Sequence, residues 1–266
     1  DGAPPTMVAE DADRNLHRVW QVTDPDVIRR VQDALADKEL YIADGHHRFE
    51  TSGNFLRECR EKRWTPAAPE SFDKRLMTLF NVAEPGMSIR PIHRLVHGVA
   101  GFDAESFLAK AAEHFAVTRF PTFEAMEEAT RAGKDRHTFG FAARGVHATL
   151  AFRDERVMDR LIAGSWSADT KRLDVSILHA AILEPLLGID ARALEEERNI
   201  TYSVTLEKGR KGIESGTEQI FFLLNPTGAD EVVRVADHGE KMPQKSTDFY
   251  PKLLTGLVAM KMEIRK

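Results

Sequence analysis

Apolar residues recur along the chain at two spacings, one typical of helices and the other of strands. Apolar side chains three or four positions apart predict helices over residues 25–35, 46–59, 104–114, 123–132, 173–187, 229–237 and 249–262. Short alternating or wholly apolar runs predict strands over residues 76–82, 89–97, 115–120, 138–142, 148–152, 199–204 and 219–226. The mixture predicts an α+β fold.

The length of 266 residues allows more than one domain. The glycines at 98 and 101 mark one boundary between predicted elements. We expect a first region over residues 1–98, a middle α+β domain over 99–215, and a C-terminal strand and helix over 216–266 that closes the site.

The run from Leu40 to Thr51 contains the densest group of candidate functional residues. Four apolar residues, 40–43, are expected to end a strand and lead directly into Asp44, Gly45, two histidines and Arg48. A glycine between a strand and a helix lets the backbone approach a ligand, and the helix start directs free N–H groups toward it. This junction predicts a site for an anion, most plausibly phosphate.

The side chains of this junction suit several roles. Arg48 offers a planar fork for two phosphate oxygens, and His46 and His47 can donate to a third. Asp44 could orient a histidine, hold a metal ion or accept a proton from an attacking hydroxyl, and the sequence leaves these three roles open. The simpler alternative is a capping aspartate followed by solvated basic residues.

A second cationic segment precedes the predicted last helix, at Lys245, Ser246 and Thr247. It is not a Walker motif, because Gln244 replaces the glycine before the lysine and Pro243 lacks a backbone donor. If a helix begins here, Ser246 or Thr247 caps it and Lys245 places a cation at its anion-attracting end. The alternative is an ordinary helix start.

A third basic group lies in the predicted strand over residues 89–97. In a strand, His93 and His97 share one face with Leu95, while Arg94 lies on the other face. We therefore expect His93 or Arg94, but not every base of the run, to contact a ligand. A transition-metal site of His46, His47 and His93 is a weaker alternative, because adjacent histidines seldom bind one ion well. The isolated histidines are taken as structural: residues 17, 114, 137, 147 and 179.

The overall composition excludes several classes of protein. The 42 acidic residues exceed the 37 basic ones, for a net charge of -5, which argues against a nucleic-acid binder. Cys59 is the only cysteine, so neither an internal disulfide nor a cysteine zinc site can form. No apolar run approaches the roughly 20 residues that span a bilayer. We expect a soluble cytoplasmic protein, with oligomerisation left open.

The motifs described above, and several further stretches, resemble those of a known protein family. The chain resembles the bacterial and archaeal family called domain of unknown function 1015, in stretches from one end to the other. The matching stretches are YIADGHHRFET at 41–51, PIHRLV at 91–96, LDVSILHAAILEPLLGI at 173–189, FFLLNPT at 221–227 and MPQKSTDFYPKLLTGL at 242–257. Family members usually carry a longer N-terminus, so this chain is expected to be a truncated copy.

The DGHHR stretch is also similar to the phosphate-binding motif of the ParB and sulfiredoxin superfamily, which includes free serine kinases. This second resemblance implies a ParB/sulfiredoxin-like mixed α/β first region and phosphoryl transfer from ATP or ADP, with Mg²⁺, to serine, or from phosphoserine in reverse. It implies that Arg48 and His47 hold the β-phosphate, that Lys245 and Ser246 reach the transferred group, and that Asp44 takes the hydroxyl proton or binds Mg²⁺.

The resemblance leaves alternatives open. The superfamily's kinases carry a further N-terminal carboxylate, so a truncated chain could bind nucleotide without catalysis. One alternative is a nucleotide sensor or a ParB-type regulator associated with DNA, and another is a metal-dependent hydrolase. The kinase hypothesis predicts that residues 44–48 and 242–247 meet in one cleft.

Overall fold

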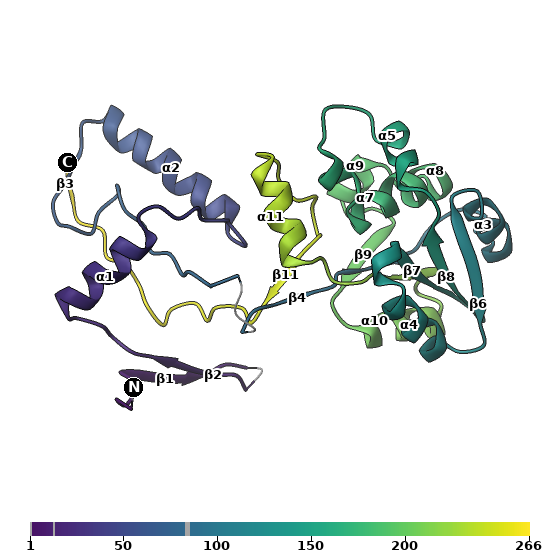
Figure 1. Ribbon diagram of the computed structural model, residues 1–266, viewed down its shortest axis with the longest axis horizontal. Coiled ribbons are helices and arrows are strands. Elements are labelled where there is room, and N and C mark those ends of the chain that lie inside the picture. Colours follow the sequence, from purple (N-terminus) through teal and green to yellow (C-terminus); the bar gives the residue numbers. More distant parts are fainter. Residues whose placement is uncertain (1, 13, 83–85) are drawn as a thin grey trace. The chain divides into compact units, whose positions relative to one another are not determined.

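A computed structural model describes residues 2–12, 14–82 and 86–266, and it divides the chain into two compact units. Unit 1 combines the two ends of the chain, Asp1–Pro85 and Pro251–Lys266, and unit 2 comprises Gly86–Tyr250. Both units contain helices and strands (Figure 1), so the predicted α+β class is confirmed.

Unit 2 is built on a six-stranded sheet in the order β6-β8-β7-β10-β5-β9, in which every pair of neighbours is antiparallel. The strands are β5 (His93–Val96), β6 (Phe115–Phe120), β7 (Thr138–Ala143), β8 (Val146–Phe152), β9 (Ile200–Ser203) and β10 (Ile220–Leu223). Two further strands, β4 (Ser88–Arg90) and β11 (Asp248–Tyr250), pair with each other where the chain enters and leaves this unit.

Helices cover both faces of this sheet. They are α3 (Ala104–Ala111), α4 (Phe123–Ala132), α5 (Met158–Leu161), α6 (Ala168–Lys171), α7 (Asp174–Leu178), α8 (Glu184–Leu187), α9 (Ala191–Glu195), α10 (Leu206–Ser215) and α11 (Ala229–Asp237). Short 3₁₀ turns lie at η1 (Lys134–Arg136) and η2 (Glu155–Val157), and a π-helical turn at η3 (His179–Leu183) joins α7 to α8.

The alternation of side chains along the strands separates two cores. Phe141 and Phe222 belong to the larger core, which α3 and the α7–α8 segment complete, and Phe107 of α3 stacks on Phe141 at 5.0 Å. Leu95 and Phe221 lie in the smaller core with α4 and α10, whose side chains cover the opposite face. Burial of these aromatic side chains is the main source of stability for unit 2.

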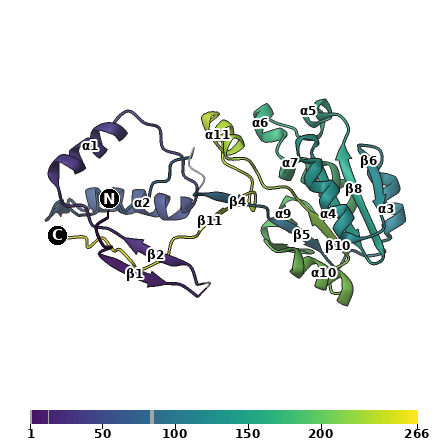
Figure 2. The same ribbon diagram turned by 60° about the horizontal axis from the view of Figure 1, so that its bottom comes forward.

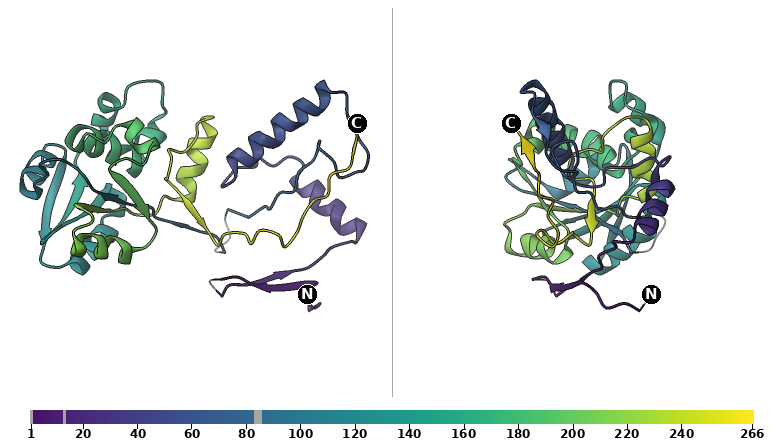
Figure 3. Two further views of the ribbon diagram at one scale, coloured as in Figure 1. Left: turned by 180° about the vertical axis from the view of Figure 1, so that it is seen from behind. Right: turned by 90° about the vertical axis from the view of Figure 1, so that its left-hand side faces the viewer.

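Unit 1 has much less regular structure. Its elements are β1 (Met7–Glu10), β2 (Leu16–Val19), α1 (Pro25–Leu35), α2 (His46–Glu61), β3 (Thr65–Pro66) and β12 (Ile264–Arg265). β1 and β2 form a hairpin, visible in Figure 2, and β12 pairs with β3. Extended segments join α1, α2 and the hairpin (Figure 3).

Few apolar side chains of unit 1 are buried. Cys59 and Phe72 are its buried hydrophobic residues among those described, whereas Val27, Val31 and Leu35 on one face of α1 are exposed. Asp24 caps α1 by accepting a hydrogen bond from the N–H of Asp26. In the described parts of both units, no helix has the length and apolar character needed to cross a membrane.

Most predicted elements are confirmed, and the clearest successes lie in unit 2. β6 and α4 have the predicted limits, and α1, α2, α3, β7, β8, β9, β10 and α11 lie where they were expected. The predicted strand over residues 89–97 is split at Pro91 into β4 and β5, and the helix over 173–187 contains the π-helical turn. Helix α10 was not predicted.

Three predicted elements are wrong. Residues 40–43 and 76–82 form no strand, and they have no neighbouring strand in the described structure to pair with. Residues 249–262 form no helix, because Tyr250 belongs to β11 and Gly256 has a φ of 95°. The expected boundaries at 98 and 215 do not coincide with the two compact units, since β5 and β10 are neighbours in one sheet.

Candidate functional site

The predicted anion site is the N-terminus of the 16-residue helix α2, in unit 1. Gly45 is its N-cap with a φ of 85°, and no side chain caps the helix. A Cβ on Gly45 would lie 2.8 Å from Nη2 and 3.0 Å from Nε of Arg48. The guanidinium therefore lies directly against the glycine backbone, beside the first N–H groups of the helix, in space that a larger residue would take.

Asp44 sits at the same helix start and is ionised at neutral pH. Its Oδ1 accepts a hydrogen bond from the N–H of Gly45 at 2.7 Å, and its Oδ2 lies 3.3 Å from Nζ of Lys252. Partial burial works to raise the pKa of Asp44, but the positive charge of Lys252 and the Gly45 hydrogen bond outweigh it and leave the pKa lowered. This carboxylate is the only acidic side chain among residues 44–48.

The two histidines of the motif are exposed on the first turn of α2. His46 is exposed, and the fully exposed ring of His47 lies 3.8 Å from the carboxylate of Glu50. In the part of the chain that the structure describes, no three His, Cys, Asp or Glu side chains come together as metal ligands. The alternatives that need such a group, a three-histidine metal site and a metal-dependent hydrolase, find no support there.

His93 and Arg94 lie on opposite faces of β5, as the alternation predicts. His93 packs edge-on against Phe221 at 5.5 Å, and its Nδ1 accepts the backbone N–H of Leu224 at 3.2 Å. Burial, assisted by the charge of Arg94, lowers the pKa of His93 to about 4. His93 is therefore neutral at physiological pH, and its Nδ1 is occupied by the protein itself.

Arg94 is only 5% exposed, on the face of the larger core. Its Nη1 donates to the carbonyl of Ile92, and the guanidinium lies 5.3 Å from the ring centroid of Tyr202. No carboxylate pairs with Arg94 in the described residues. Burial lowers the pKa of Arg94 to about 10, so the side chain stays charged at neutral pH.

Lys245 lies near the same tyrosine. Its Nζ is 5.2 Å from the ring centroid of Tyr202 and 3.1 Å from a carboxylate oxygen of Glu197. The backbone of Lys245 has a φ of 56°, a region that L-residues seldom adopt. Arg94 and Lys245 are thus brought to one aromatic ring from distant parts of the sequence, entirely within unit 2.

The neighbours of Lys245 differ from the prediction. Ser246 is buried and donates its hydroxyl to the carbonyl of Pro243, while Thr227 donates to the carbonyl of Ser246 at 3.1 Å. Since β11 follows in place of a helix, neither Ser246 nor Thr247 is a helix cap, and Lys245 gains nothing from a helix dipole. Arg48 belongs to unit 1 and Lys245 to unit 2, so their common cleft stays a prediction.

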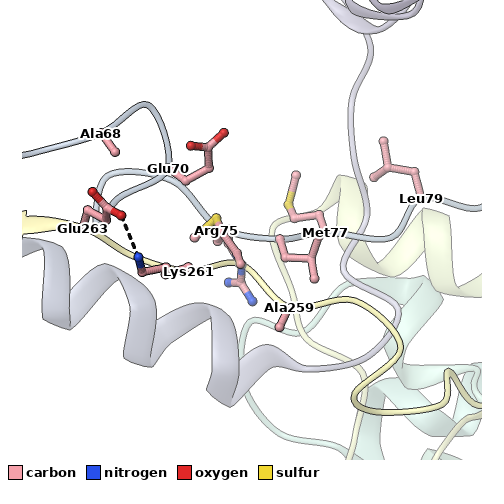
Figure 4. Close-up of a pocket in the computed structure, with 10 residues that line it drawn as sticks. Ala68, Glu70, Arg75, Met77, Leu79, Ala259, Lys261 and Glu263 are labelled. Atoms are coloured by element: carbon pink, nitrogen blue, oxygen red, sulfur yellow. Dashed lines mark hydrogen bonds and ion pairs between the residues drawn. The ribbon is translucent and has the colours of Figure 1, made fainter. Parts of the chain in front are cut away.

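Sequence reasoning missed several polar groups that the fold places in unusual surroundings. In unit 1, Arg75 borders a cavity of about 670 Å³ between residues 68–79 and 259–263 (Figure 4). Its guanidinium lies 5.0 Å from the ring centroid of Phe49, and its Nε and Nη1 are buried without a hydrogen-bond partner. Tyr202 and His179 were missed in unit 2. Arg75 and Tyr202 stand in no local motif, and His179 lies in the 173–189 stretch without any pattern of polar residues around it that would indicate a role.

Several solved structures are similar to this chain at low sequence identity. A free serine kinase mutant in complex with AMP has a TM-score of 0.41 at 13% identity, over 86% of this chain and 81% of the other. A conserved hypothetical protein from Pyrococcus furiosus has a TM-score of 0.40 at 13% identity, over 86% and 84%. A free serine kinase mutant in complex with ADP has a TM-score of 0.40 at 13% identity, over 86% and 81%. TM-scores at this level do not show a common fold or activity.

The comparison of sequences gives a firmer result. No curated protein matches the chain. A family model described as protein of unknown function (DUF1015) matches residues 1–176, which include the DGHHR motif, β5 and the start of α7. The expected resemblance over residues 221–257 lies outside the matched region. Because the match covers more than half of the chain, the protein belongs to this DUF1015 family.

Proposed function

We propose that this protein is a nucleotide-dependent phosphotransferase that acts on a small hydroxyl metabolite and binds the nucleotide phosphates at the N-terminus of α2. The observation that carries the proposal is the position of the Arg48 guanidinium against Gly45, at a helix start that no side chain caps. A planar cation and free N–H groups at one point suit a phosphate group.

The backbone supplies the donors for this site. The N–H of Gly45 is taken by Asp44, and the first intrahelical bond of α2 runs from Phe49 to the carbonyl of Gly45. The N–H groups of residues 46–48 precede that bond, so no carbonyl within the helix can satisfy them. Together with Arg48, they offer donors to several oxygens of a diphosphate.

Asp44 supplies the acid-base function in this proposal. The substrate hydroxyl oxygen bonds to the terminal phosphorus of ATP or ADP, the bond from that phosphorus to the bridging oxygen breaks, and the nucleotide leaves with the bridging electrons. Asp44 either accepts the hydroxyl proton or would hold a Mg²⁺ through one carboxylate oxygen, with phosphate oxygens as further ligands of the ion. Its lowered pKa keeps it ionised and available for either role.

Serine is the substrate that we favour, with phosphoserine in the reverse direction. The support is the similarity of DGHHR to the phosphate-binding motif of a superfamily that includes free serine kinases. The negative net charge of -5 argues against DNA as the partner of this site.

Calorimetric titration with ADP and ATP, with and without Mg²⁺, tests this proposal. We expect Arg48→Ala to remove nucleotide binding and to leave the melting temperature of the ligand-free protein nearly unchanged, since Arg48 is exposed. Arg60→Ala, in the last turn of the same helix, is the matched control and should bind as the unmodified protein does.

Phosphorus NMR of a mixture with serine and either nucleotide then shows whether phosphoserine forms. Unchanged affinity in Arg48→Ala would contradict the assignment of the site. A large loss of stability in that variant would identify Arg48 as a structural residue instead.

A further inference from the structure

Unit 2 contains a cationic cluster in which the buried Arg94 has no carboxylate partner among the described residues. The cluster, called here the Arg94 cluster, consists of Arg94, His179, Tyr202 and Lys245. Three of its members come from separate elements, β5, η3 and β9, and Lys245 comes from the segment before β11.

The first observation is the state of Arg94. A guanidinium remains protonated at neutral pH, and a buried cation is strongly unfavourable unless a counter-charge and hydrogen bonds compensate it. Arg94 has five N–H donors, of which one is used on the carbonyl of Ile92. The aromatic face of Tyr202 provides partial compensation, and no described carboxylate provides the rest.

The second observation is an unsatisfied imidazole. The Nδ1 of His179 is buried without a hydrogen-bond partner, while its Nε2 lies 3.4 Å from Glu184. Burial and the nearby charge of Arg94 lower the pKa of His179 more than Glu184 raises it, so the ring is neutral. His179 opens the π-helical turn η3, a departure from α-helix that recurs at functional sites.

The third observation is the charge of the whole cluster. Lys245 contributes a second cation beside Tyr202, and Glu197 at 3.1 Å neutralises one positive charge. Lys245 and Glu197 neutralise each other, and Glu184 and Asp190 work to raise the pKa of His179, but no carboxylate offsets the charge of the buried Arg94 in the described residues. One anionic charge is what the cluster lacks.

We propose that the Arg94 cluster binds the carboxylate of a small substrate. This assignment rests on the proposed function, for which it specifies the substrate class as hydroxy monocarboxylates, with serine as one member. A carboxylate carries a single charge and fits the guanidinium fork in a bidentate manner. A phosphate monoester carries about -1.5 to -2 at neutral pH and would leave negative charge unbalanced in a buried place.

Calorimetry without nucleotide tests the proposal, with L-serine and glycolate as probes. Ethanolamine is the matched negative control, because it keeps the amine and the hydroxyl of serine and lacks the carboxylate. We expect millimolar or tighter binding of both carboxylates and no binding of ethanolamine, and in Arg48→Ala, which lacks the proposed phosphate site, weaker binding of inorganic phosphate than of L-serine. No carboxylate binding in the millimolar range, or a preference for phosphate in Arg48→Ala, would overturn the proposal.

Two variants test the residues. Arg94→Met removes the charge at similar length and should weaken L-serine binding roughly tenfold or more, and Lys245→Met should weaken it to a smaller extent. Because a lone buried charge is removed, the melting temperature of Arg94→Met without ligand should stay level or rise. Should that variant fail to fold, Arg94→Lys keeps the charge but loses the fork and should still weaken binding.

A separate readout keeps this proposal distinct from the proposed function. Arg94→Met should bind ADP as the unmodified protein does, and Arg48→Ala should bind L-serine unchanged in the absence of nucleotide. Loss of ADP binding in Arg48→Ala with full L-serine binding in Arg94→Met would overturn the carboxylate site alone. The reverse pattern, in which Arg48→Ala retains ADP binding and Arg94→Met loses L-serine, would overturn the nucleotide site alone.

Discussion

The imidazole of His93 on β5 accepts a hydrogen bond from the backbone N–H of Leu224, the residue that follows β10, at 3.2 Å. The bond continues the pairing of β5 with β10 beyond the last residue pair of the ladder. Only a neutral imidazole can accept it, because a protonated ring has no free lone pair. The buried position of His93 therefore couples its protonation to the stability of the sheet.

We predict that acid destabilises unit 2 through His93. The pKa is lowered to about 4 in the folded state from an ordinary value of 6.5, so the unfolded chain binds more protons between these values. Stability should fall as pH decreases through that window, by about 1.4 kcal/mol per unit and about 3 kcal/mol in total. In His93→Asn, whose carbonyl oxygen can accept the same bond, urea unfolding should show a smaller loss between pH 7 and pH 4. An equal decrease in the free energy of unfolding between pH 7 and pH 4 in the unmodified protein and in His93→Asn would refute the assignment.

Protonation of His137 should stabilise the fold, in contrast to protonation of His93. Its Nδ1 lies 2.8 Å from Asp174 and its Nε2 3.4 Å from Glu155. Burial works to lower the pKa of His137, but the hydrogen bond and charge of Asp174, with the charge of Glu155, raise it overall. The stabilisation is then complete below the ordinary value and is lost as pH rises through the raised pKa.

The variant His137→Asn tests this relationship and suits the left-handed backbone there, where φ is 45°. We expect it to lower the free energy of unfolding more at pH 6 than at pH 8.5, as measured by urea titration. An equal loss at both values would mean that packing, and not charge, accounts for the role of His137.

The glycine at the start of α2 should be sensitive to a single methyl group. Gly45→Ala places a Cβ at a φ of 85° and within 2.8 Å of the Arg48 guanidinium. We expect a loss of about 1–2 kcal/mol of stability and a displaced Arg48 with weaker ADP binding. Gly53→Ala in the same helix is the control, since nothing lies within 4 Å of its added Cβ. It should gain up to about 1 kcal/mol and bind ADP normally, and equal ADP affinity in both variants would argue against the site.

The contact of α10 with the sheet should also depend on the absence of a side chain at Gly209. A Cβ on Gly209 would lie 2.5 Å from the ring of Phe221, which is fully buried and stacks on Phe123. Gly209→Ala should therefore cost about 1–3 kcal/mol, because the close-packed ring has no room to move. Thermal unfolding of Glu214→Ala, an exposed position on the same helix, provides the reference and should show little change. A melting temperature for Gly209→Ala equal to that of the reference would show that the core adjusts freely.

Local pattern was sufficient where an element is buried on the face that its own period defines. The helix over residues 123–132 and the strand over 115–120 were located to the residue, and the two faces of β5 followed from alternation. The pattern failed over residues 249–262, where apolar side chains such as Leu253 and Val258 stay exposed and their spacing reflects no packing. It also failed at residues 40–43, because a strand exists only where another strand pairs with it.

The two candidate sites differ in the same way, because local sequence could predict one of them and not the other. The DGHHR motif is contiguous, so its helix start and the glycine at positive φ were foreseeable from residue types alone. The Arg94 cluster joins residues that lie far apart along the chain, and the π-helical turn that presents His179 has no sequence signature. His179 was therefore taken as structural, and only the fold shows that its Nδ1 is buried without a partner and that the charge of Arg94 acts on its pKa.

The composition of unit 1 from both ends of the chain has a consequence for synthesis on the ribosome. Ile264 pairs with Pro66, and Ser71 donates its hydroxyl to the carbonyl of Glu263 at 2.6 Å. These partners are synthesised only after all of unit 2 has been made. Unit 2 can thus reach its native state during translation, whereas the early residues that carry DGHHR must wait until residues 251–266 have followed unit 2.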